Sequence, residues 1–166
     1  MTRKGEVLTP MEVRKEALYA QILEQLEALL DGSLPPVSNL ANASALLFQA
    51  LPGLNWAGFY LLREGELVLG PFQGKPACTR IALDRGVCGA AARQNRVQNV
   101  PDVHAFPGHI ACDGASKSEI VLPLHNTNGG VAGVLDIDSP LPARFDAADE
   151  AGLRKVVLVL EKIVFQ

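Results

Sequence analysis

The chain has 166 residues, of which 48% are hydrophobic and 20% are charged, and its formal net charge is −3. This length suits one domain with a core of its own, and the composition excludes a disordered or low-complexity chain. The small negative charge argues against a nucleic-acid-binding protein, which normally carries a basic face. No apolar stretch approaches the roughly 20 residues of a membrane span, and no secretory signal is visible. We therefore expect a cytoplasmic protein with neither a nucleic-acid partner nor a membrane partner.

Two helices are predicted at the start of the chain. The first begins at the capping box Thr9-Pro10-Met11-Glu12, continues with apolar residues at helical spacing and ends at Gly32. The second is expected to be capped by Ser38 and to end at Ala50.

From Asn55 onward, short apolar segments alternate with turns, which indicates strands. Strands are expected at 56–62, 67–69, 81–83, 97–100, 119–124 and 131–138, with a short helix at 86–94 and a long loop at 101–117. Asp146 is expected to cap a final helix. Because hairpins outnumber crossovers, the pattern predicts an α+β fold. We expect a single domain over residues 1–166 with a central antiparallel sheet and the N- and C-terminal helices packed on one face.

Three cysteines are the first candidates for chemistry, and an odd number argues against a disulfide framework. No two are only two to four residues apart, as is typical of structural zinc sites, although a zinc site that recruits His104 or His109 is an alternative. Cys112 and Cys78 lie in loop sequence, whereas Cys88 lies near the start of a short helix, where backbone N–H groups favour a thiolate.

Three acids form the second candidate group. Asp136 and Asp138 lie two residues apart on a strand, so both side chains project from the same face. Glu119 opens the preceding strand of the same hairpin. Together they predict an acidic pocket that could bind an ammonium group or keep one carboxyl protonated as a proton donor.

Several segments resemble the GAF-domain free methionine-(R)-sulfoxide reductase family. The resemblance is concentrated in residues 55–149 and includes all three cysteines and all three acids. It is carried by GPFQGKPAC at 70–78, GVCG at 86–89, VPDVHAFPGHIACD at 100–113, SEIVLPL at 118–124 and GVLDIDSP at 133–140.

The resemblance implies a GAF-like fold and reduction of free methionine-R-sulfoxide without a cofactor or a metal. A cysteine thiolate attacks the sulfoxide sulfur and becomes a sulfenic acid, a second cysteine condenses with it, and thioredoxin reduces the disulfide. Cys112 is the expected nucleophile, with Cys88 as the rival, and Cys78 or Cys88 resolves the sulfenic acid. The three acids are expected to contact the substrate, together with Trp56 and Tyr60.

Three other questions stay open at this point. The alternative function is a non-enzymatic GAF module that senses a small molecule, which would bind a ligand without turnover. A homodimer stays open as the oligomeric state. Trp56 could equally belong to the core or to the pocket wall, and His125, beside an Asn-Gly turn, is expected to be solvated.

Overall fold

The computed structural model describes residues 7–110 and 112–166. Its elements are α1 (Pro10–Leu29), α2 (Pro36–Ala50), β1 (Trp56–Arg63), β2 (Glu66–Gly74), β3 (Arg80–Ala82), α3 (Gly86–Gln94), β4 (Gln98–Val100), the short 3₁₀ helix η1 (Val103–Ala105), β5 (Ser118–His125), β6 (Val131–Ser139) and α4 (Ala147–Val164). Within the described residues, no helix is both long enough and apolar enough to cross a membrane.

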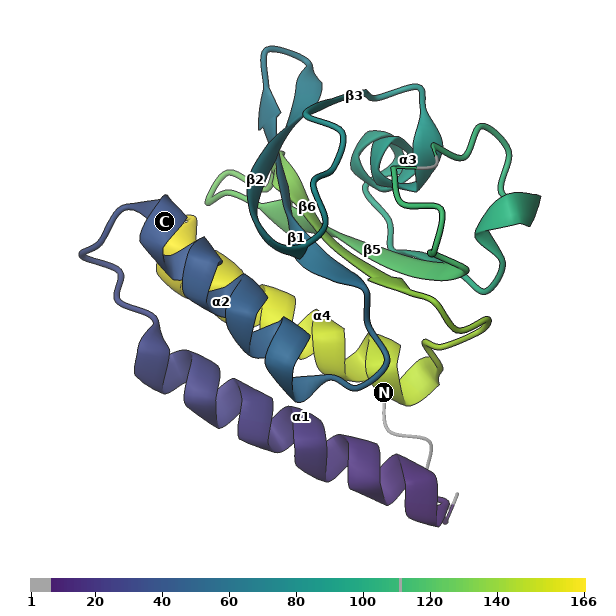
Figure 1. Ribbon diagram of the computed structural model, residues 1–166. Helices are drawn as coiled ribbons and strands as arrows, with labels where there is room; N and C mark the ends of the chain where they lie inside the picture. Colours follow the sequence, from purple (N-terminus) through teal and green to yellow (C-terminus); the bar gives the residue numbers. More distant parts are fainter. Residues whose placement is uncertain (1–6, 111) are drawn as a thin grey trace.

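The strands form one antiparallel sheet in the order β3-β2-β1-β6-β5-β4. Helices α2 and α4 pack on one face of this sheet and α1 lies outside them, while α3 and the long loop cover the opposite face (Figure 1). The predicted α+β fold with terminal helices on one face is confirmed. The two central strands, β1 and β6, therefore have a covered surface on both sides.

The helix boundaries follow from local hydrogen bonding. In α1 the backbone N–H of Glu12 donates to Thr9 Oγ1 at 3.2 Å, and the N–H of Thr9 donates to Glu12 Oε2 at 2.7 Å, which completes the predicted capping box. The predicted cap of α4 is also confirmed, since the N–H of Asp149 donates to Asp146 Oδ1 at 3.0 Å.

The predicted start of α2 was wrong. This helix begins at Pro36, with Pro35 as its N-cap and no side-chain cap, so Ser38 lies inside the first turn. Proline presets the helical φ angle and has no N–H that needs a partner, so a helix can begin at a proline without a capping hydroxyl.

The second strand was predicted too short. It continues beyond Leu69 to Gly74, through the sequence Gly70-Pro71. Gly58 pairs with Phe72 and Tyr60 pairs with Leu69, so β2 has one residue more than β1 here, and the bulge lies at Gly70-Pro71 opposite Phe59. A bulge accommodates a residue that cannot donate to the ladder, and the longer strand brings the segment that carries Cys78 across β1.

The two faces of the sheet have different contents. The face under α2 and α4 buries the larger apolar core, which includes Leu47, Phe59, Leu122, Ile137 and Leu160. The face under α3 buries a smaller cluster that includes Trp56, Tyr60, Cys88, Val121 and Val134. Neighbouring residues on a strand point to opposite faces. A residue next to a member of the larger core therefore points to the face that α3 covers.

A glycine contact between α1 and α4 yields the first prediction. A Cβ added to Gly152 would lie 2.2 Å from the nearest ring carbon of Tyr19. We expect Gly152→Ala to lower the free energy of unfolding by about 1–3 kcal/mol, although alanine normally favours a helix interior by up to about 1 kcal/mol. Urea unfolding measures the change, with Gly114→Ala as control because its added Cβ meets nothing within 4 Å. An unfolding free energy at or above that of the unsubstituted protein would contradict the prediction.

Candidate active site

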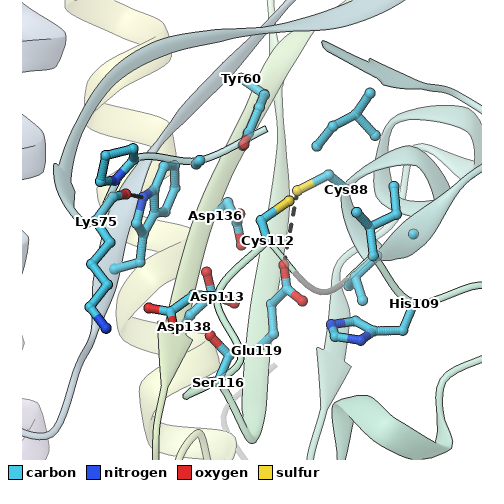
Figure 2. A pocket seen from close by; sticks show the side chains of 17 residues that line it. Tyr60, Lys75, Cys88, His109, Cys112, Asp113, Ser116, Glu119, Asp136 and Asp138 are labelled. Atoms are coloured by element: carbon cyan, nitrogen blue, oxygen red, sulfur yellow. Dashed lines mark hydrogen bonds between the residues drawn. The ribbon is translucent and has the colours of Figure 1, made fainter. Parts of the chain in front are cut away.

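A cavity with a free volume of about 40 Å³ lies on the face of the sheet that α3 covers (Figure 2). Strands β1, β5 and β6 contribute one side of it, and α3 with the segments 75–77, 109–110 and 112–116 contributes the other. Its lining consists of Trp56, Tyr60, Lys75, Pro76, Ala77, Ile81, Gly86, Val87, Cys88, His109, Ile110, Cys112, Asp113, Ser116, Glu119, Asp136 and Asp138.

The three predicted acids meet in this cavity because of the strand register. Glu119 on β5 lies directly opposite Asp138 on β6, and Asp136 is two residues before Asp138 on the same face. Glu119 is 6% exposed and Asp136 is 5% exposed. The predicted clustering of the acids is confirmed, while their part in catalysis stays a prediction.

Among the described residues, the acids of this cluster have no ion-pair partner. Burial raises the pKa of Glu119 and Asp138 well above their ordinary values, and the charge of Asp136 raises both further. Burial also raises the pKa of Asp136. None of the ion pairs found among the described residues includes these carboxylates, and Asp136 Oδ1 finds no hydrogen-bond partner there. Such a cluster favours bound protons or a cationic ligand.

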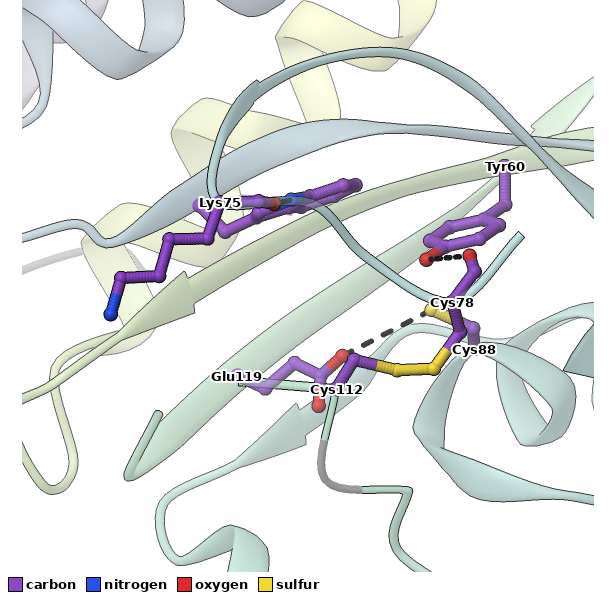
Figure 3. The surroundings of a disulfide bond; sticks show 7 residues. Tyr60, Lys75, Cys78, Cys88, Cys112 and Glu119 are labelled. Carbon is purple, nitrogen blue, oxygen red and sulfur yellow. Dashed lines mark hydrogen bonds between the residues drawn. A yellow bond between two sulfur atoms is a disulfide. The ribbon is translucent and has the colours of Figure 1, made fainter. Parts of the chain in front are cut away.

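Two of the three cysteines are joined above the acids. Cys78 and Cys112 form a disulfide across 34 residues, with their Cα atoms 5.8 Å apart (Figure 3). One partner follows β2 and the other lies in the long loop, so the bond connects the two segments that cover the cavity. The sequence left the pairing open, and the structure pairs Cys112 with Cys78.

Cys88 has a different environment. It is 4% exposed on α3, and its Sγ is the donor to Glu119 Oε1 at 4.0 Å (Figure 3). Burial, and after it the charges of the nearby acids, raise the pKa of this thiol well above its ordinary value. The expectation that the helix start favours a thiolate here was wrong, because desolvation and three carboxylates outweigh a short helix.

Trp56 belongs both to the buried interior and to the wall of the cavity. Trp56 is only 3% exposed and also lines the cavity, stacked between Tyr60 and Phe72 with ring centroids 5.8 Å and 5.2 Å away. Its indole N–H donates to the carbonyl oxygen of Lys75 at 3.2 Å, and the Tyr60 hydroxyl donates to the carbonyl oxygen of Cys78 at 2.9 Å. The two aromatics thus fix the 75–78 segment to β1.

One trio of side chains could surround a cation. The Sγ atom of Cys88, one carboxylate oxygen of Glu119 and one of Asp136 all lie within 4.8 Å of one another. Thiol and carboxyl groups can bind a metal ion, but the same buried, electron-rich surface also suits the ammonium group of an amino acid.

Sequence reasoning missed four residues at this site. Lys75 lines the cavity from the segment after β2, and Asp113 and Ser116 line it from the loop after Cys112. Asn55, just before β1, donates from its side chain to both of these loop residues. Their signal in the sequence was only their closeness to Cys78, Cys112 and the first strand, which does not specify a contact.

The histidines divide between two regions. His109 lines the cavity, and its ring lies edge-on to His104 at 6.3 Å. Burial, together with the charge of His104, lowers the pKa of His109. His125 is not simply solvated as expected, because its Nδ1 lies 2.8 Å from Glu161 Oε1 and its Nε2 lies 2.5 Å from Asn95 Oδ1.

Known proteins share this fold and much of this sequence. The model of the GAF domain family matches residues 16–163. The free methionine-R-sulfoxide reductase of Escherichia coli is 54% identical over 152 residues, which cover 92% of each chain. That of Saccharomyces cerevisiae is 46% identical and covers 90% of this chain and 87% of its own. A structure of the Neisseria meningitidis free methionine-R-sulfoxide reductase with its substrate superposes with a TM-score of 0.82 at 41% identity, covering 98% of this chain and 95% of that one.

The raised carboxyl pKa values predict how stability depends on pH. The folded protein binds protons on Glu119 more tightly than the unfolded chain does, so stability is highest below the ordinary pKa of 4.5 and is lost as pH rises from there toward the raised value. We expect Glu119→Gln to reduce this loss and to be more stable than the unsubstituted protein at pH 8 by about 1 kcal/mol or more, since one pKa unit corresponds to about 1.4 kcal/mol.

The measurement is urea unfolding of both proteins at several values between pH 5 and pH 8. The matched control is Glu16→Gln, which changes an exposed carboxylate on α1 and should follow the unsubstituted protein. Parallel pH curves for the unsubstituted protein and Glu119→Gln would show that the buried carboxyl does not titrate abnormally.

Proposed function

Because this chain belongs to the GAF-domain free methionine-(R)-sulfoxide reductase family, we propose that it reduces free methionine-R-sulfoxide to methionine and is recycled by thioredoxin. The observation that carries the proposal is the Cys78–Cys112 disulfide beside three acids in one cavity, of which Glu119 and Asp136 are buried and Asp138 is half-buried. A pair of cysteines that can be oxidised and reduced supplies two electrons, which is what the reduction of a sulfoxide requires.

The cavity offers a place for each part of the substrate. The ammonium group lies against the carboxylates of Asp136 and Asp138, which have no cation of their own. The side chain packs against Trp56 and Tyr60, which form the aromatic wall. The α-carboxylate lies toward Lys75, the lysine at the cavity edge (Figure 2). This arrangement supports recognition of a free amino acid.

The reaction begins with the reduced pair. The Cys112 thiolate attacks the sulfoxide sulfur, and the protonated carboxyl of Glu119 donates its proton toward the sulfoxide oxygen, which must be protonated to leave sulfur. The attack joins the Cys112 sulfur to the methionine sulfur. As this sulfur–sulfur bond breaks, the protonated oxygen passes from the methionine sulfur to the Cys112 sulfur, so methionine departs and Cys112 becomes a sulfenic acid. The Cys78 thiol attacks this sulfur, water leaves, and the disulfide forms. Thioredoxin dithiol then exchanges with the disulfide and restores both thiols.

The assignment of the cysteines follows from their surroundings. Cys112 and Cys78 lie in segments at the cavity edge with Cα atoms 5.8 Å apart, a separation that a disulfide spans readily. Cys88 is buried with a raised pKa and donates to Glu119, so it is poorly suited to act as a thiolate at neutral pH. We therefore assign Cys112 as nucleophile and Cys78 as resolving cysteine, and give Cys88 no redox role but that of a buried thiol in the cavity wall that donates to Glu119.

Single-turnover chemistry tests the assignment of the cysteines. We expect Cys112→Ser to form no methionine, because it lacks the attacking sulfur. Cys78→Ser should form about one methionine per protein chain and then stop at the sulfenic acid, while Cys88→Ser should retain the disulfide-forming pair. The measurements are methionine yield from reduced protein and trapping of sulfenic acid with dimedone. A full methionine burst from Cys112→Ser would transfer the role of nucleophile to Cys88.

A substrate with a blocked amino group tests whether the cavity recognises the ammonium group of a free amino acid. N-acetylation removes the ammonium group and leaves buried carboxylates without their partner, which costs roughly 1.5–3 kcal/mol or more, and the added group must also fit beneath the covering loop. We expect kcat/KM for N-acetylmethionine-R-sulfoxide to be at least about 100-fold lower than for the free amino acid. Comparable values would mean that the ammonium group is not recognised.

The decisive experiment is turnover of free methionine-R-sulfoxide with thioredoxin, thioredoxin reductase and NADPH, with the S epimer as control. Consumption of NADPH that depends on the R epimer supports the reductase and its reductant. Turnover with dithiothreitol but not with thioredoxin would retain the reductase and reject thioredoxin. Binding without turnover under either reductant would instead favour a sensor module. A cytoplasmic location, where thioredoxin is kept reduced, is part of the same proposal.

A further inference from the structure

Asn55 connects the start of β1 to the loop segment that follows Cys112. Its side-chain amide donates one hydrogen bond to Asp113 Oδ2 at 3.0 Å and another to Ser116 Oγ at 2.9 Å. Its backbone N–H donates to the carbonyl oxygen of Asp138 at 3.0 Å. One residue thus contacts both the strand that carries an acid of the cavity and the loop that carries the cysteine.

We propose that Asn55 is a positioning residue that holds Cys112 over the acid cluster when the enzyme is reduced. The two side-chain hydrogen bonds to Asp113 and Ser116 are here called the Asn55 bridge. The inference rests on the proposed function in one respect, namely that Cys112 is the thiol that reacts.

The bridge matters because the loop segment has few other attachments. The other hydrogen bonds of 112–116 to described residues are local. The N–H of Cys112 donates to the carbonyl oxygen of Ile110 at 3.1 Å, the N–H of Ala115 donates to Asp113 Oδ1 at 2.9 Å, and the N–H of Ser116 donates to the carbonyl oxygen of Asp113 at 3.2 Å. The next connection to the sheet is the backbone of Lys117, whose N–H donates to the carbonyl oxygen of Ser139 at 2.8 Å. Among the described residues, Asn55 and Cys78 are therefore the hydrogen-bonded and covalent links from this segment to the rest of the molecule.

The two links act in different redox states. The bond to Cys78 holds the segment only while the disulfide exists, and the attack on substrate requires the reduced thiols. In the reduced enzyme the disulfide link is gone, and the Asn55 bridge is the side-chain hydrogen-bonded link that remains between this segment and the other described residues. The bridge therefore acts during the attack on the substrate, the step whose rate depends on the position of Cys112.

The chemistry of the contact fits an asparagine. The carboxylate of Asp113 accepts from the backbone of Ala115 and from Asn55, and these contacts lower its pKa, so it stays ionised. An amide supplies two N–H donors from one nitrogen and carries no charge, so it can serve Asp113 and Ser116 together. An aspartate at position 55 would supply neither donor and would face a like charge.

Hydrogen exchange tests the bridge without depending on turnover. In the reduced protein, Asn55→Ala should raise amide exchange in residues 112–117 by about tenfold or more, because opening of the segment no longer breaks two side-chain bonds. In the oxidised protein the same substitution should change this exchange much less, because the disulfide still holds the segment. Asn55→Asp should act like Asn55→Ala or more strongly, since it adds repulsion with Asp113.

The matched control is Asn99→Ala, which removes another asparagine that links a strand to a loop, through a bond from its Nδ2 to the carbonyl oxygen of Phe145 at 3.1 Å. It should leave exchange in 112–117 unchanged. Ser116→Ala, which deletes one of the two bonds, should give a smaller increase and should add less than its full effect in the Asn55→Ala background. These partial variants keep the test decisive should Asn55→Ala fail to fold.

Kinetics then connect the bridge to the chemistry. Methionine formation in a single turnover should slow by about 10- to 100-fold in Asn55→Ala, since small displacements of a reacting group have effects of that size, and the pH profile of Cys112 alkylation should shift. Equal exchange in both redox states, or no change in the reduced protein, would overturn the positioning role even if the unsubstituted enzyme turns over. An inactive unsubstituted enzyme with the expected exchange pattern would instead overturn the proposed function and leave the bridge in place.

Discussion

The site depends on three carboxyl groups that lie together on neighbouring strands, with Glu119 and Asp136 buried and Asp138 half-buried. Isolated charge in an apolar interior is costly, and Glu119, Asp136 and Asp138 have no ion-pair partner among the described residues. The folded protein therefore favours the protonated acids or a cation brought by a ligand. The raised pKa values of these groups and the recognition of an ammonium group are two consequences of the same unbalanced charge.

Burial of apolar side chains on the opposite face of the sheet offsets the free-energy cost of burying these acids. Ile137 lies between Asp136 and Asp138 on β6 and points into the larger core with Leu135, while Ile120 and Leu122 do the same beside Glu119 on β5. A slip of one residue in the register of β5 and β6 would exchange these two sets of side chains. The large core thus fixes the register, and the register in turn fixes the distance between the acids.

The sequence was most informative where a regular pattern carries the information. The alternation along β6 predicted that Asp136 and Asp138 share a face, and the capping box at Thr9 and the cap residue Asp146 predicted where two helices begin. It was uninformative about contacts between distant segments. Cys88 looked activated by its helix, yet its burial against Glu119 comes from β5. Likewise nothing near Asn55 indicates that it would reach a loop 58 residues away.

The disulfide connects the chemistry to the redox state. In the oxidised protein, the Cys78–Cys112 bond joins the two segments that cover the cavity. Attack on the sulfoxide needs the free thiolate of Cys112, so under the proposed mechanism reduction by thioredoxin precedes the attack in each cycle. In the reduced protein the position of Cys112 cannot rely on a covalent bond. Reversible contacts, those of Asn55 with Asp113 and Ser116, hold the loop there instead, and they can still open when methionine leaves.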